Sequence, residues 1–392
     1  MTIVVFALIL LILVLIHEFG HFLVAKKLGI KVEEFAFGFP PRLFSRKKGE
    51  TEYSVNLLPI GGYVKLYGED DAGGGKISFK DTISKVIERD RAYFARPPVQ
   101  RLMVGVAGVV MNVLLAAFIF YVYFIISGFK AELPLLSDHH FFVATEQKQS
   151  DIVISAVVKD SPADKIGIKP FSFITKVNGI PVTSSNQFVG LVNANKGKQI
   201  SISWKEDKTS QEFTSRVIPR ISPPKNQGAL GIAFTTLSSA TLLYTTPTQK
   251  ILSGIIHPIN LMAYNFDLMG QLIGNAIKTK NAAPLSQGVA GPVGIYSLVG
   301  SIVSIPNAKE RILEILNLAG LLSMSLAVFN ILPIPALDGG RVFFILIEMI
   351  VGKKLNPRIE SIANSIGIAL LLTLLLFVTL HDVLRQLSGS GF

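Results

Sequence analysis

The chain has 392 residues, of which 49% are hydrophobic and only 17% are charged, whereas soluble globular proteins carry about 25% charged residues. This composition excludes a disordered chain and argues against an entirely soluble one. Lys and Arg outnumber Asp and Glu by 38 to 27, and the basic loops of a membrane protein explain this excess without nucleic-acid binding.

Four apolar stretches are long enough to cross a membrane, which takes about 20 residues. They predict transmembrane helices at residues 1–25, 102–129, 312–340 and 361–380. A cleaved signal peptide is the alternative for the first stretch, but no basic residue precedes it and no small-residue cleavage site follows it. Residues 248–304 contain amphipathic stretches that we expect to form helices on the membrane surface.

The distribution of basic residues predicts the orientation of these spans. Basic residues gather in the loop 26–101 and again between the third and fourth spans, which marks both loops as cytoplasmic. Both termini and the long segment 130–311 then lie outside. Four spans are consistent with this polarity.

Two regions outside the spans are predicted to be β-rich. In residues 53–66, two alternating apolar arms flank Pro59-Ile60-Gly61-Gly62, which predicts a β-hairpin next to the membrane within the loop 26–101. In residues 152–220, alternating segments indicate strands, and Asn178-Gly179 between two of them is typical of a tight hairpin turn.

The segment 152–220 also resembles a PDZ domain. The resemblance rests on "SPADKIGIK" followed by "ITKVNGIPV", in which Ser161 opens a short helix. Pro170 to Phe173 stands where the family usually has Pro-Gly-Asp, and no glycine-rich carboxylate-binding loop precedes Val157. We therefore expect a steric gate here rather than a domain that captures free peptide C-termini.

The first predicted span carries an HExxH pattern, His17-Glu18-Phe19-Gly20-His21. Positions i and i+4 of a helix face the same side, so the two imidazoles can hold one Zn²⁺, and Glu18 beside them can take a proton from water. Ionisable residues inside a membrane span are costly and normally functional. A polar helix end that reaches the interface is the alternative, but it would favour Lys or Arg.

A catalytic zinc usually has three protein ligands, and the chain contains no cysteine to supply one. The extended motif of soluble metzincins would place the third ligand at position 27, which is Lys27 and cannot serve. Asp338, near the cytoplasmic end of the third span, is the candidate. Pro333 and Pro335 would break the helix there, which a membrane tolerates only beside protein or a water-filled cavity. An ordinary turn is the alternative, because Asp-Gly-Gly is also good turn chemistry.

Four further residues are predicted to bind substrate: Asn330, Asn112, Gly61 and Gly62. Asn330 is placed to clamp a peptide backbone, and an edge strand of the 53–66 hairpin could pair with an unwound peptide. Gly105, Gly108 and Asn112 share one helix face, where small residues allow close packing. Asn112 either reaches the site or makes an interhelical hydrogen bond.

These motifs together resemble the site-2 protease family of intramembrane zinc metalloproteases. The resemblance is carried by HExxH in the first span and NxxPxPxLDGG near the end of a later one. Four more segments agree, namely "EEFAFGFPPRLF", "LLPIGGYVKL", "QRLMVGVAGVVMN" and "GVAGPVGI". In the third of these, Val109 replaces the usual proline. The single PDZ-like domain indicates the bacterial one-PDZ type, similar to regulator-of-sigma proteases.

The resemblance implies a zinc endopeptidase of the bacterial inner membrane, with its active site near the cytoplasmic side. It implies that His17, His21 and Asp338 bind Zn²⁺ and that Glu18 is the catalytic base. The enzyme would cleave single-span proteins in regulated intramembrane proteolysis. Anti-sigma factors after a first cut, or signal-peptide remnants, are the expected substrates.

The expected fold is a polytopic α-helical membrane protein of about four transmembrane helices. It includes the membrane-associated β-hairpin and an inserted extracytoplasmic PDZ-like domain. We expect a monomer in the lipid bilayer with no nucleic-acid partner. Two alternatives stay open, a non-enzymatic PDZ membrane scaffold without stoichiometric metal and a metal transporter that would tolerate replacement of Glu18.

Overall fold

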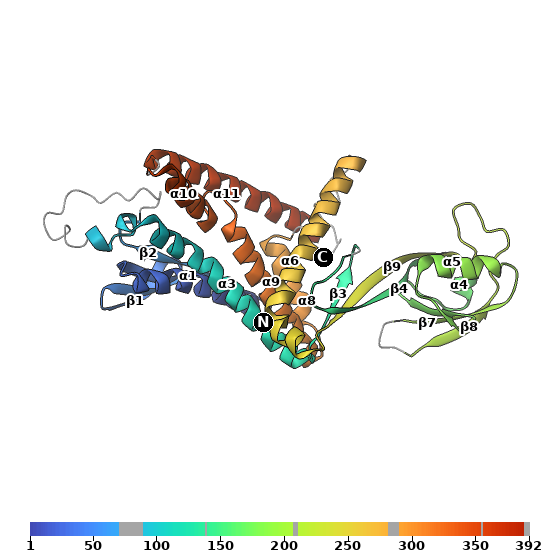
Figure 1. Ribbon diagram of the computed structural model, residues 1–392. Coiled ribbons are helices and arrows are strands. Elements are labelled where there is room, and N and C mark those ends of the chain that lie inside the picture. Colours follow the sequence, from blue (N-terminus) through green and yellow to red (C-terminus); the bar gives the residue numbers. More distant parts are fainter. Residues whose placement is uncertain (70–88, 138, 207–210, 281–289, 354–355, 388–392) are drawn as a thin grey trace. The chain divides into compact units, whose positions relative to one another are not determined.

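The computed structural model describes residues 1–69, 89–137, 139–206, 211–280, 290–353 and 356–387 (Figure 1). The chain divides into two compact units. The first, which we call the membrane unit, combines residues 1–128 and 250–392, and the second consists of residues 129–249. Part of the predicted interfacial region, residues 281–289, lies outside the described residues.

Four long helices of the membrane unit are apolar enough to cross a membrane, which confirms the four predicted spans as helices. They are α1 (Thr2–Lys27), α3 (Pro98–Ser127), α9 (Ala308–Ile331) and α11 (Pro357–Leu387). Their ends follow from local sequence. For α3, Pro98 occupies the first turn, where a missing N–H costs nothing, and Gly128 closes the helix with φ of 72°.

The third span differs from its predicted extent of 312–340. Helix α9 ends at Ile331, and a separate helix α10 runs over Asp338–Val351. Pro333 and Pro335 lie in the connecting loop, where proline cannot donate the backbone hydrogen bond of a continuing helix. Asp338 therefore begins a new helix instead of ending the third span.

Glycines let the spans approach α3 closely, and α3 contacts α1, α9 and α10. A Cβ atom on Gly20 of α1 would lie 2.5 Å from the Ala107 carbonyl oxygen of α3, and one on Gly320 of α9 would lie 2.6 Å from the Phe120 ring. At such distances a side chain would fit only if a neighbouring atom shifted. The small residues thus let α1 and α9 pack closely against α3.

The described residues of the membrane unit also form α6 (Pro247–Thr279, most of which belongs to this unit), α8 (Pro292–Val303), and the short 3-10 helices η1 (Arg89–Arg91) and η2 (Tyr93–Ala95). Helix α6 is a long helix where the amphipathic pattern predicted one. The buried carboxylate of Asp382 in α11 accepts hydrogen bonds from the backbone N–H groups of Gly291 and Gly294 at 3.0 and 2.8 Å. It thereby caps the N-terminus of α8.

The membrane unit also contains a sheet of two long strands, β1 (Val32–Lys48) and β2 (Thr51–Leu66). Residues 34–37 of β1 each have two partners in β2, one among residues 52–55 and one among residues 62–65. The central part of the sheet is therefore flanked on both sides by the same strand.

The predicted hairpin of residues 53–66 is wrong. Its two arms do not pair with each other, because residues 34–37 lie between them. An alternating apolar pattern shows which face of a strand is buried, but it does not identify the neighbouring strand. As a consequence, residues 62–66 form an edge of this sheet within the described part of the chain.

Residues 129–249 form a seven-stranded sheet in the order β3-β9-β4-β5-β7-β8, with β6 paired to β5. The strands are β3 (Lys130–Leu135), β4 (Thr145–Val157), β5 (Phe173–Val177), β6 (Ile180–Pro181), β7 (Ile200–Lys205), β8 (Phe213–Val217) and β9 (Ile232–Leu243). Two helices accompany them, α4 (Pro162–Lys165) and α5 (Ser185–Ala194). The inner faces of the strands bury the chain's one tryptophan, Trp204.

Several local features of this unit match the sequence patterns. The Ser161 side chain caps α4 by accepting from the Asp164 N–H, and Asn178 and Gly179 turn the chain between β5 and β6 with φ of 52° and 76°. The predicted boundaries 152–220 are too narrow, because they cut β4 and omit β3 and β9. Strand β9 pairs with β4 along most of its length, a contact between segments far apart in sequence.

Candidate active site

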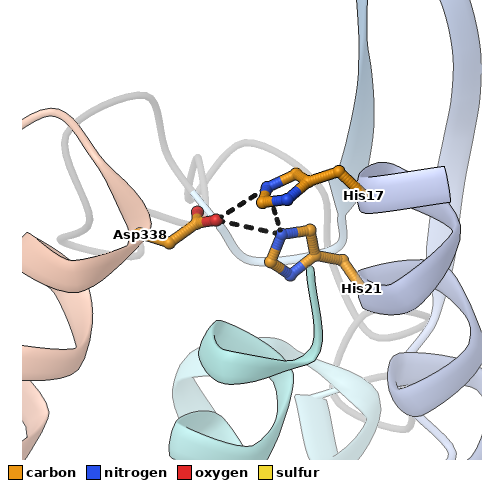
Figure 2. A group of neighbouring side chains, drawn as sticks. All are labelled: His17, His21 and Asp338. Carbon is orange, nitrogen blue, oxygen red and sulfur yellow. Dashed lines mark hydrogen bonds and ion pairs between the residues drawn. The ribbon is translucent and has the colours of Figure 1, made fainter. Parts of the chain in front are cut away.

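Three side chains from two helices meet in the membrane unit (Figure 2). The Nε2 atom of His17 lies 2.9 Å from Oδ2 of Asp338, and Nε2 of His21 lies 3.2 Å from the same oxygen. The two Nε2 atoms are 3.3 Å apart. Helix α1 thus contributes both histidines from one face, and the first residue of α10 contributes the carboxylate.

This group of atoms fits the requirements of a zinc ion. Zinc takes His nitrogen and carboxylate oxygen at about 2.0–2.2 Å in a tetrahedral arrangement, which puts ligand atoms roughly 3.3–3.5 Å from one another. The three observed separations, 2.9 to 3.3 Å, approach that spacing. Three protein donors also leave a fourth position open, as catalytic zinc sites do.

Helix α3 supports both histidines from behind. The Nδ1 atom of His21 lies 2.8 Å from the backbone carbonyl oxygen of Val104, so Nδ1–H donates to it and the Nε2 lone pair stays free for a metal. The Nδ1 atom of His17 lies 3.1 Å from the side-chain amide of Asn112. Gly108 lies between these two contacts, and a Cβ atom there would be 2.6 Å from Cε1 of His17.

The loop before Asp338 is held by close backbone packing. A Cβ atom on Gly340 would lie 2.5 Å from the Ile334 carbonyl oxygen, and one on Gly339 would overlap the Leu332 carbonyl. Ala336 has φ of +78°, and its N–H donates to Oδ1 of Asn364 in α11 at 3.1 Å. The Asp-Gly-Gly sequence therefore serves packing as well as placing the carboxylate.

A cavity of about 410 Å³ opens beside the three side chains. Glu18, His21 and Asp338 line one part of it, and Arg341 forms an ion pair with Glu69 at its wall. Glu18, the predicted catalytic base, thus lines the same cavity as two of the predicted zinc ligands, His21 and Asp338. Tyr63, Val64, Lys65 and Leu66 from the sheet edge line the same cavity.

The predicted substrate-binding residues occupy different places. Asn330 lies near the ligands, with Nδ2 3.5 Å from Nε2 of His17, and Gly62 lies where an added Cβ would meet Glu18 at 3.7 Å. Gly61 packs against Phe39 with φ of +95°. Asn112 is fully buried behind His17, and its contact with that residue favours the interhelical hydrogen bond over a contact with substrate.

Sequence reasoning missed Asn364, Arg341 and Glu69. Asn364 is a polar residue within a membrane span, which is itself a signal of function or of a buried hydrogen bond. Arg341 follows Asp338 by three residues and shares its helix face. Glu69 offered no such signal, because its proximity to Arg341 arises only from the fold.

Comparisons with known proteins identify the family of the chain. The profile described as peptidase family M50 matches residues 5–374. A Clostridium perfringens protein that is provisionally named a zinc metalloprotease is 34% identical over 373 residues, covering 95% of each chain. The regulator of sigma-W protease RasP of Bacillus subtilis is 28% identical over 452 residues, covering 98% of each.

A solved structure resembles a smaller part of the chain. The PDZ domain of an SdrC-like protein from Listeria monocytogenes is 19% identical, and the match covers 21% of this chain and 86% of that one with a TM-score of 0.19. The interpretation of residues 152–220 as PDZ-like stays a prediction.

Proposed function

The chain belongs to peptidase family M50 and is a zinc metalloprotease of the site-2 protease family, and we propose that it cuts transmembrane segments of single-span proteins. It is a multi-pass protein of the inner membrane, and Zn²⁺ is its cofactor. Family membership favours a protease over the scaffold and the transporter. The substrate, the site residues and the orientation are our proposals.

We propose His17, His21 and Asp338 as the residues that hold zinc. A bound Zn²⁺ supplies Lewis acidity, which polarises a peptide carbonyl and makes water easier to deprotonate. The Val104 carbonyl keeps the His21 ring oriented with Nε2 toward the site. Asp338 stands in the first turn of α10, where the helix dipole favours its negative charge.

Glu18 is proposed as the catalytic base. It is adjacent to His17 in sequence and faces the cavity that also contains His21 and Asp338. Its carboxylate would take a proton from the attacking water and pass that proton to the leaving amine. This role requires a carboxylate but no metal bond, so Glu18 and the three ligands make different predictions on replacement.

The substrate is proposed to add as an extended strand to residues 62–66. A helical peptide keeps its carbonyls hydrogen-bonded, so the segment to be cut must first unwind. The edge strand of residues 62–66 is where such a segment would add to the sheet, and residues 63–66 of this edge line the cavity beside Glu18. Gly62 brings this edge near the base, and Asn330 could hold the other side of the peptide.

The orientation and the substrates follow from sequence and relationship. Basic loops favour a cytoplasmic active site, an external N-terminus and an extracytoplasmic PDZ-like domain. One relative is a regulator of sigma-W protease, which supports anti-sigma factors after a first cut as substrates, alongside signal-peptide remnants. We propose a monomeric enzyme in which residues 129–249 restrict the size of the substrate.

The observation that carries the proposal is the convergence of His17, His21 and Asp338 beside Glu18. The test is cleavage of a single-span model substrate by purified enzyme in detergent, with and without a zinc chelator. We expect cleavage that the chelator abolishes and added zinc restores. Glu18→Gln should keep its zinc yet cut nothing. Cleavage that resists the chelator, or near wild-type turnover by Glu18→Gln, would refute the mechanism.

A further inference from the structure

The side chain of Asn112 has an unusual environment in the middle of α3. The residue is 0% exposed, and its Nδ2 atom lies 3.1 Å from Nδ1 of His17. Its Oδ1 atom is buried and has no hydrogen-bond partner in the part of the chain that the structure describes. The Asn112 backbone carbonyl accepts from the Ser323 hydroxyl of α9 at 2.8 Å, which fixes its position between two helices.

The chemistry of His17 determines which end of this amide must face it. The Nε2 atom of His17 points toward His21 and Asp338, so a metal bound there takes the Nε2 lone pair and the ring proton stays on Nδ1. A ring N–H needs an acceptor, and an amide NH₂ group is only a donor. Half a turn about the last bond of the asparagine exchanges its oxygen and nitrogen without changing its shape.

We propose that Asn112 is a positioning residue that accepts the Nδ1–H of His17 through Oδ1 and thereby holds His17 in its metal-binding tautomer. This resolves both observations, because the unpaired oxygen gains a donor and the ring nitrogen gains an acceptor. The inference rests on the proposed role of His17 as a zinc ligand. Asn112 does not touch the substrate, and acts only through His17.

The two histidines are then supported in the same way by one helix. His21 donates to the Val104 carbonyl, which is backbone and survives any substitution. His17 depends on a side chain, so its orientation is open to mutation. Loss of an acceptor behind a metal-binding histidine typically weakens metal binding by about 10- to 100-fold.

Two substitutions of Asn112 distinguish the effect of its hydrogen-bond acceptor from the effect of its packing. Asn112→Leu keeps a similar volume but removes the acceptor, whereas Asn112→Asp keeps an oxygen facing His17. Ser323→Ala is the matched control, because it removes the other buried hydrogen bond at this residue and leaves the amide in place. If Asn112→Leu does not fold, Asn112→Ala replaces it, with thermal unfolding of the metal-free proteins as the criterion.

The measurement is zinc affinity of the full-length detergent-solubilised proteins, by competition with chelators of graded strength. We expect Asn112→Leu to bind zinc about 10- to 100-fold more weakly, and Asn112→Asp and Ser323→Ala to bind like the wild type. Wild-type affinity in folded Asn112→Leu, or equal losses in Asn112→Leu and Asn112→Asp, would overturn the inference. His17→Ala is measured in parallel, and full zinc binding by that variant would refute the proposed metal site itself.

Discussion

Replacing Gly108 by alanine tests how closely α3 backs the two histidines. A Cβ atom at this position would lie 2.6 Å from Cε1 and 2.7 Å from Nε2 of His17, and it would also overlap Nε2 of His21. Overpacking of this kind costs about 1–3 kcal/mol. If the strain falls on the metal-bound arrangement, zinc affinity should fall by about 5- to 150-fold, since about 1.4 kcal/mol is a factor of ten.

The assay is chelator competition on purified Gly108→Ala, with thermal unfolding measured on the same samples. Alanine also stabilises a helix relative to glycine by about 1 kcal/mol. Gly270→Ala in α6 measures this effect alone, because a Cβ atom at Gly270 would have no neighbouring atom within 4 Å among the described residues. We expect Gly270→Ala to bind zinc normally. Wild-type affinity in Gly108→Ala would show that the histidines are free to move away, and that α3 does not hold them.

Three other predictions concern the loop before Asp338, the ion pairs of Glu50 and the unit of residues 129–249. Asn364→Ala removes the acceptor for the Ala336 N–H, which should loosen the loop before Asp338 and lower zinc affinity. Asn364→Asp keeps an acceptor and should bind zinc like the wild type. Equal zinc affinities of Asn364→Ala and the wild type would show that this hydrogen bond does not support the site. Hydrogen bonds from Arg91 and Lys26 lower the pKa of Glu50 from 4.5 to about 2. These interactions therefore stabilise the fold above about pH 4.5, and the stabilisation is lost as the pH falls toward 2. Glu50→Gln should accordingly lower the melting temperature at pH 7 but not near pH 2, and an equal loss at both would contradict the ion-pair explanation. Replacing residues 129–249 by a short linker should let the enzyme cut a full-length substrate that the intact enzyme ignores, and unchanged selectivity would exclude the gate.

The membrane helices and the placement of His17 and His21 on one helix face were predictable because each depends on local sequence. An uncharged run of membrane length has few alternatives to a helix, and His17 and His21 share a face once α1 is a helix. The sequence indicated that Asp338 lies near the two histidines only because the helix ends that carry them were expected at the same depth in the membrane. Its exact setting, at the start of α10 after a loop seated on α11, was not predictable from the run of apolar residues.

The features that escaped prediction depend on contacts between distant segments. Residues 34–37 separate the two arms of β2, and the alternation of apolar residues in the arms is the same for either pairing. Asn112 was recognised as a polar residue on the right helix face, but its full burial behind His17 depends on how closely Gly108 lets α1 and α3 approach. Strand β9 joins β4 from a distant part of the chain, so the compact unit is wider than the predicted domain.

We propose that His17, His21 and Asp338 hold one catalytic zinc, which the metal content of the purified protein reports. The measurement is elemental analysis of purified full-length wild type, Asp338→Ala and, as a matched loss of a buried carboxylate elsewhere, Asp382→Asn. We predict about one zinc per chain in the wild type and in Asp382→Asn, as a mononuclear catalytic site requires, and well below one in Asp338→Ala. A full complement of zinc in folded Asp338→Ala would show that Asp338 is not a zinc ligand.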